Sequence, residues 1–144
     1  MDAAEDVQRV GLGPALTGVP SHQIYWRRPF ALVRATPDVA RGIGAELNRM
    51  LRPGGFVEFR VLEATDVPVV REVAKQIEGA RVVEVPQAAI RYFRGRGGQR
   101  QPGLTDEQWQ ILEEAAPDVQ RQLGALGQGT FDRIIRIIRI YRTR

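Results

Sequence analysis

Two short segments of this 144-residue chain interleave arginine with aromatic residues. The first is YWRRPF, beginning at position 25, and the second is RYFRGRGGQR, beginning at position 91. Guanidinium groups neutralise phosphates and aromatic rings stack on bases, so the pattern is typical of surfaces that bind nucleic acid or another anion. The candidate binding residues are Tyr25, Trp26, Arg27, Arg28, Phe30, Arg91, Arg94, Arg96 and Arg100. The competing interpretation places the rings in the core and leaves the arginines as a solvated rim.

Acid–base chemistry has two candidate residues. His22 is the only histidine, and a general base needs a second group that handles protons. Glu63 follows an apolar segment at the expected end of a parallel strand, where α/β sheets place ligands. His22 and Glu63 are therefore the candidate catalytic residues. The competing interpretation is that His22 is a solvated loop residue and that Glu63 forms a salt bridge with an arginine. With one histidine, no cysteine and scattered carboxylates, the sequence predicts no metal site.

The composition excludes several classes of protein. Hydrophobic residues make up 43% and charged residues 26%, which is typical of a globular domain. The absence of cysteine excludes disulfides and thiolate chemistry. No apolar run reaches the roughly 18–20 residues of a membrane span. The net charge is only +4, and 20 of the 21 basic residues are arginine, a bias that a GC-rich genome also produces.

Local patterns place the elements that must position these residues. Residues 1–22 are expected to be an irregular lead-in. Thr36 with Pro37 predicts the start of a helix, and Thr105 with Gln108 forms a capping box for another. The remaining expected elements are strands near 23–28, 56–62, 81–85 and 88–93 and a helix over 66–77.

The closing segment FDRIIRIIRIYRTR, residues 131–144, carries arginine at every third position. On a helix these arginines would spread around the surface. As a strand, the segment has apolar residues on both faces, so it must lie inside a sheet covered on both sides. Its arginines must then reach an edge, an acidic partner or a ligand. The rival interpretation is a cationic helix on a membrane surface.

From residue 23 to the end, the order of elements resembles the C-terminal half of class I S-adenosylmethionine-dependent methyltransferases. LNRMLRPGGFVEFRVLE is similar to that family's helix, Pro-Gly-Gly turn and fifth strand. ARVVEVPQAAIRYF and FDRIIRIIRIYRTR are similar to its closing antiparallel pair. The resemblance implies an α/β fold with a partial Rossmann-like sheet, helices on both faces and an antiparallel C-terminal strand. It makes residues 23–144 one half-domain, with a basic loop and helical insertion at 94–129.

The departures from the family concern its active site. Only 22 residues precede the counterpart of the fourth strand, which is too few for the family's cofactor-binding half. We therefore expect no bound cofactor and loss of S-adenosylmethionine binding. Where amino-methylating members have Asn-Pro-Pro-Tyr, this chain has Arg27-Arg28-Pro29-Phe30, which lacks the asparagine that accepts the amine hydrogen.

These observations lead to three functional hypotheses. The first is a non-methylating, methyltransferase-like module that binds RNA, DNA or another anionic target. It would be a toxin or effector domain of a larger secreted bacterial protein, working in the cytoplasm and opposed by a cognate immunity protein. The second is an enzyme for hydrolysis or group transfer that uses His22, Glu63 and arginines. The third is an interaction module completed by a partner chain or by homodimerisation.

Overall fold

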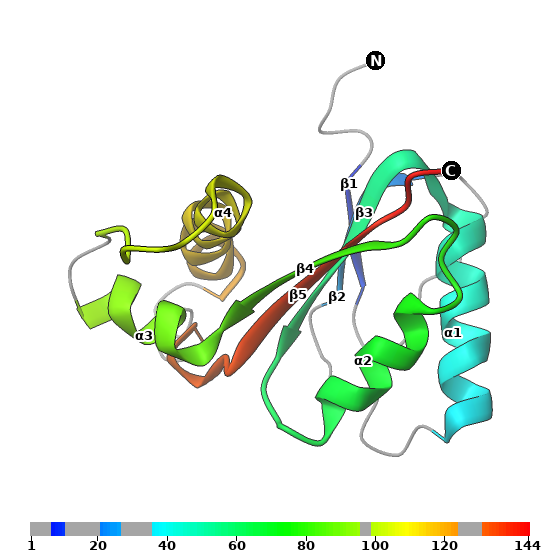
Figure 1. The fold of residues 1–144 in the computed structure, drawn as a ribbon, viewed down its shortest axis with the longest axis horizontal. Helices are drawn as coiled ribbons and strands as arrows, with labels where there is room; N and C mark the ends of the chain where they lie inside the picture. Colours follow the sequence, from blue (N-terminus) through cyan, green and yellow to red (C-terminus); the bar gives the residue numbers. More distant parts are fainter. Residues whose placement is uncertain (1–6, 11–20, 27–35, 96–98, 124–130) are drawn as a thin grey trace.

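The computed structural model describes residues 7–10, 21–26, 36–95, 99–123 and 131–144. Side chains are described for 36–95, 99–117 and 131–144. The fold is mixed α/β, with one sheet between two groups of helices (Figure 1). The strands are β1 (Val7–Val10), β2 (Ser21–Trp26), β3 (Leu51–Val61), β4 (Arg81–Pro86) and β5 (Arg136–Tyr141). The helices are α1 (Pro37–Met50), α2 (Asp66–Ala74), α3 (Gln87–Gly95) and α4 (Asp106–Leu123). β1 and the start of β2 fall in the segment that the sequence predicts to be irregular.

The strand order is β1-β2-β3-β5-β4. The first three strands are parallel, and β5 runs antiparallel to both of its neighbours. The closing segment therefore contains an interior strand, as its two apolar faces predict. Ile137, Ile138 and Ile140 are completely buried, which is incompatible with a helix lying on a membrane surface.

The helices α1 and α2 cover one face of the sheet. Thr36 begins α1, and its hydroxyl accepts a hydrogen bond from the backbone N–H of Val39 at 3.3 Å. The core on this face contains Leu47 of α1 together with Phe59 of β3 and other buried apolar residues. Val39, which the helical spacing assigns to the apolar face, is instead 50% exposed because it lies in the first turn beyond the sheet's cover. The helices pack closely, since a Cβ on Gly44 would lie 2.7 Å from the backbone oxygen of Val73.

The helices α3 and α4 cover the other face near β4 and β5. The strand predicted over 88–93 is wrong, because these residues belong to α3. Pro86 lacks a backbone donor and ends β4, and the spacing of Ala89, Ile90 and Phe93 fits one face of a helix. Phe93 packs against Trp109 and Phe131, with ring centroids 5.6 and 6.1 Å apart. Tertiary packing therefore decided a segment whose apolar residues allow either structure.

The capping box at the start of α4 is confirmed. The backbone N–H of Gln108 donates to Thr105 Oγ1 at 3.1 Å, and the backbone N–H of Thr105 donates to Gln108 Oε1 at 3.0 Å. Gln108 Nε2 also donates to the carbonyl oxygen of Glu84 at 2.9 Å. β4 is the last strand of the described sheet, so one side of its backbone has no neighbouring strand. The bond from Gln108 occupies the carbonyl of Glu84 on that side, and Pro86 has no N–H to offer to another strand. Together they protect the edge against pairing with another chain.

Candidate functional site

The first aromatic–basic segment is described only in part. His22, Tyr25 and Trp26 lie in β2, whose backbone alone is described, while Arg27, Arg28, Phe30 and Arg96 lie outside the described residues. Tyr25 is the register partner of Glu58 in β3. Because β2 and β3 are parallel neighbours, their C-terminal ends lie at the same end of the sheet. Proximity of His22 and Glu63 is not expected, since His22 lies near the start of β2 and Glu63 follows the end of β3.

The second segment contributes to an exposed basic surface. Arg91 and Arg94 are three residues apart on α3, which places them on the same side of the helix. Arg94 forms an ion pair with Asp132, which lies in a single helical turn over residues 131–133. The exposed Arg133 follows directly in the chain. We call the three exposed arginines Arg91, Arg94 and Arg133 the α3 surface.

The other parts of this segment serve the fold. Arg100 Nη2 donates to the carbonyl oxygen of Leu104 at 2.8 Å and to Asp106 Oδ1 at 2.9 Å, so it stabilises the entry to α4. Phe93 lies in the aromatic cluster with Trp109, and Tyr92 is half-buried. Base stacking by Phe93 therefore loses support, because its ring packs against Trp109 and Phe131. Arg133 is not among the candidate binding residues from the sequence, because the arginines of the closing segment were assigned to an interior strand or, alternatively, to a membrane-surface helix.

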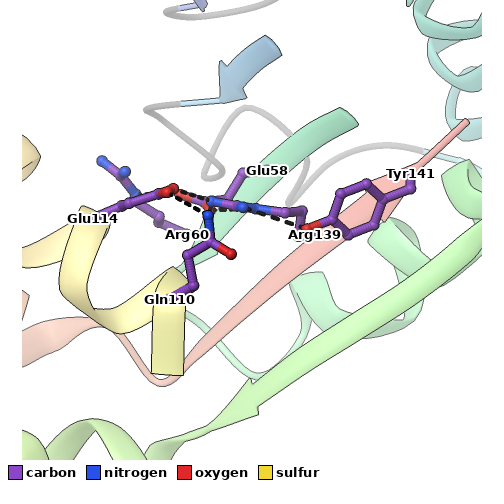
Figure 2. A network of polar contacts seen from close by, with 6 residues as sticks. All are labelled: Glu58, Arg60, Gln110, Glu114, Arg139 and Tyr141. Carbon is purple, nitrogen blue, oxygen red and sulfur yellow. Dashed lines mark hydrogen bonds and ion pairs between the residues drawn. The ribbon is translucent and has the colours of Figure 1, made fainter. Parts of the chain in front are cut away.

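A buried polar network lies in the middle of β3 and β5 (Figure 2). Glu58 is 1% exposed, and its two carboxylate oxygens accept from different arginines. Arg60 Nε donates to Oε2 at 2.9 Å, while Arg139 Nε and Nη2 donate to Oε1 at 3.0 and 2.7 Å. The antiparallel register aligns Glu58 with Arg139 directly. This confirms that an arginine of the closing strand reaches an acidic partner.

Arg139 extends the network to Glu114 of α4 and to the ring of Phe56 in β3. Its Nη2 donates to Glu114 Oε2 at 2.9 Å, and its guanidinium carbon lies 3.9 Å from the centroid of the Phe56 ring. Burial alone would lower the pKa of Arg139, but Glu58, Tyr141 and Glu114 raise it above its ordinary value. Arg139 is therefore a charged structural link that fastens α4 to the sheet.

Two further arginines of the closing segment have structural partners. Arg136 Nη1 donates to Glu84 Oε1 at 2.8 Å, and Arg71 Nη2 donates to the same oxygen at 3.1 Å. Burial opposes ionisation of Glu84, yet the hydrogen bonds from Arg71 and Arg136 lower its pKa. Arg142 Nη1 donates to the carbonyl oxygens of Asn48 and Leu51 at 2.6 and 2.7 Å. These contacts favour the structural interpretation of the arginine repeat.

The strand-end candidate Glu63 has a neighbour that the sequence analysis missed. Asp66 begins α2 and is completely buried, and neither of its carboxylate oxygens has a hydrogen-bond partner among the residues that the structure describes. Its backbone N–H donates to the carbonyl oxygen of Glu63 at 3.0 Å. Burial raises the pKa of Asp66, and the charge of Glu63 raises it further. An acid at a helix start is usually exposed, so no sequence signal distinguished Asp66.

Among residues with described side chains, no three His, Cys, Asp or Glu residues form a group able to hold a metal ion. No helix in the described ranges is both long and apolar enough to cross a membrane. No family model, curated protein or solved structure matches the chain.

Proposed function

We propose that this chain is a methyltransferase-like module that does not methylate and that binds nucleic acid through the α3 surface. The observation that carries the binding proposal is the Arg94–Asp132 ion pair, which joins α3, with its exposed Arg91, to the turn that holds the exposed Arg133. Asp132 offsets one of these charges and orients Arg94. A repeating polyanion is the ligand class that complements several exposed guanidinium groups on one surface.

The fold part of the proposal is supported by the strand order. β5 lies antiparallel between β3 and β4, and both α1 and α2 pack on one face. That arrangement is the one implied by the resemblance of the closing strands to the methyltransferase half-domain. We further propose that the chain alone does not bind S-adenosylmethionine. Calorimetry at millimolar ligand tests this directly, and a micromolar dissociation constant would overturn it.

Binding is tested by fluorescence anisotropy with a labelled single-stranded RNA and a labelled DNA duplex over a range of salt concentrations. The test variant combines Arg91→Ala, Arg94→Ala and Arg133→Ala. Since each lost phosphate contact reduces the salt slope by roughly 0.7 for a single strand, the triple variant should flatten it by roughly 2. The fold should persist, because exposed substitutions usually change stability by less than about 0.5 kcal/mol each.

A matched control removes the same charge elsewhere. Arg41→Ala, Arg49→Ala and Lys75→Ala change three exposed cations on or next to α1 and α2, on the opposite side of the sheet. This variant should retain the wild-type affinity and salt slope. Equal losses in the two triple variants would show that binding follows net charge alone, which contradicts a specific role for the α3 surface.

The toxin or effector role is a separate proposal that follows from the resemblance. Expression in a bacterial host should slow growth, and the α3-surface variant should relieve the effect if nucleic-acid binding causes it. The control triple variant should remain as inhibitory as the wild type. Normal growth with soluble wild-type protein would contradict the toxin proposal without affecting the binding result.

A further inference from the structure

The Asp66 carboxyl differs from the buried Glu58 carboxylate, whose two oxygens accept hydrogen bonds from arginines. Asp66 is completely buried, and within the described ranges neither of its oxygens has a hydrogen-bond partner. An unsatisfied buried polar group destabilises the folded state, and more so when it is charged. Groups that destabilise a fold in this way concentrate at sites where a ligand supplies the missing partner.

The surroundings of Asp66 indicate what that partner is. Glu63 lies three residues earlier, where β3 has ended and α2 has not begun. The backbone N–H of Asp66 donates to the carbonyl oxygen of Glu63 at 3.0 Å, so the two residues lie in one turn of the chain. Two ionised carboxylates in this turn would outweigh the half positive charge at the helix start. The complement is a positively charged hydrogen-bond donor.

We propose that Asp66 and Glu63 form a binding site for an organic cation, an amino or guanidino group, at the end of β3. Glu63 is exposed and makes the first contact, while Asp66 accepts hydrogen bonds from the same group inside. Residues 63–65 are all exposed, and the proposal requires this turn to move so that the ligand reaches the buried Asp66 carboxyl. The site is independent of the α3 surface.

A metal ion fits less well than an organic cation. No third carboxylate, histidine or cysteine joins Glu63 and Asp66 among the residues with described side chains. Ca²⁺ takes six to eight oxygen ligands, and Mg²⁺ requires near-octahedral coordination. An ammonium or guanidinium group needs only directed acceptors, which two carboxyls provide.

The test is isothermal titration calorimetry of the full chain with agmatine, which carries one amino and one guanidino group. Binding to the wild type should be saturable. It should tighten from about pH 5 to about pH 7, because the cation binds the ionised carboxyl. Asp66→Asn should weaken it by about tenfold or more, since a charge-assisted hydrogen bond is lost. Glu63→Gln should weaken it less.

The matched control is Glu72→Gln, which removes a carboxylate of α2 that pairs with Lys75. It should bind agmatine as the wild type does. A blocked Gly-Arg-Gly peptide distinguishes the source of the cation: tighter binding than agmatine indicates an arginine of a peptide, and weaker binding indicates a free amine. Absence of saturable agmatine binding, or equal binding by Asp66→Asn, overturns the proposal. Binding of Mg²⁺ that requires Asp66, without binding of agmatine, overturns it in favour of a metal site.

Discussion

Two buried carboxyls associated with one strand have opposite environments. Glu58, in the middle of β3, accepts hydrogen bonds from Arg60 and Arg139 on both of its oxygens. Asp66, just beyond the end of the strand, accepts none from the part of the chain that the structure describes. The first carboxyl completes a charge network that joins the sheet to α4. The second destabilises the fold, because no described hydrogen bond compensates for its burial. The comparison separates a structural acid from a candidate binding residue, although both are equally buried.

The largest expected effect comes from removing Glu58. Glu58→Ala leaves two buried guanidinium groups without their shared carboxylate, so the free energy of unfolding should fall by about 3–5 kcal/mol. Urea denaturation followed by circular dichroism measures the change. The triple variant Glu58→Met, Arg60→Leu and Arg139→Met replaces the charges by apolar groups of similar size. It should recover most of the loss, and a Glu58→Ala loss below about 1 kcal/mol would contradict the structural role.

Asp66→Asn should have the opposite sign. Removing the charge from a buried group without partners should raise the free energy of unfolding at neutral pH by about 1 kcal/mol. The same denaturation experiment measures it. Glu72→Gln, on the exposed side of α2, serves as the control and should change little. A clear loss of stability in Asp66→Asn would mean that the carboxylate has a stabilising partner in solution.

The contribution of Asp66 should also depend on pH. Its folded-state pKa is raised by burial and by Glu63, so the folded chain holds the proton more tightly than the unfolded chain. The wild type and Asp66→Asn should therefore be equally stable below the pKa of the unfolded state. The wild type should lose stability relative to the variant as pH rises through the folded-state pKa. Parallel stability curves across this range would contradict the burial of Asp66.

Glu84 should have a smaller effect on the free energy of unfolding, and its dependence on pH should have the opposite sign to that of Asp66. Although burial opposes its ionisation, the hydrogen bonds from Arg71 and Arg136 lower its pKa. Its contribution should be present above the unfolded-state pKa and disappear as pH falls through the folded-state pKa. Because the arginines are partly exposed, Glu84→Gln should cost about 0.5–1 kcal/mol at neutral pH. Thermal unfolding at several pH values measures it, and an effect that persists in acid would exclude these ion pairs as its cause.

Sequence patterns anticipated the elements whose signals are local. Thr36 and the Thr105–Gln108 pair marked helix starts because capping bonds span only three residues. The sequence patterns predicted the wrong structure at residues 88–93, where the apolar spacing suits either a strand or a helix. Packing of Phe93 against α4 favours the helix. Of the candidate site residues, Arg91 and Arg94 are exposed as the basic-surface hypothesis requires, while Arg100 stabilises the start of α4.

The sequence by itself determined that residues 136–141 form an interior strand, because alternating side chains put isoleucine on both faces and only a covered sheet buries both. The tertiary structure decided which acid each arginine meets. The β3–β5 register brings Glu58 opposite Arg139 across 81 residues of chain. The tertiary structure likewise decided that Asp66 is buried and that no described residue is its hydrogen-bond partner. The apolar periodicity and the helix caps depend on residues that are close in the sequence. The pairing and burial of charges depend on which distant segments pack together.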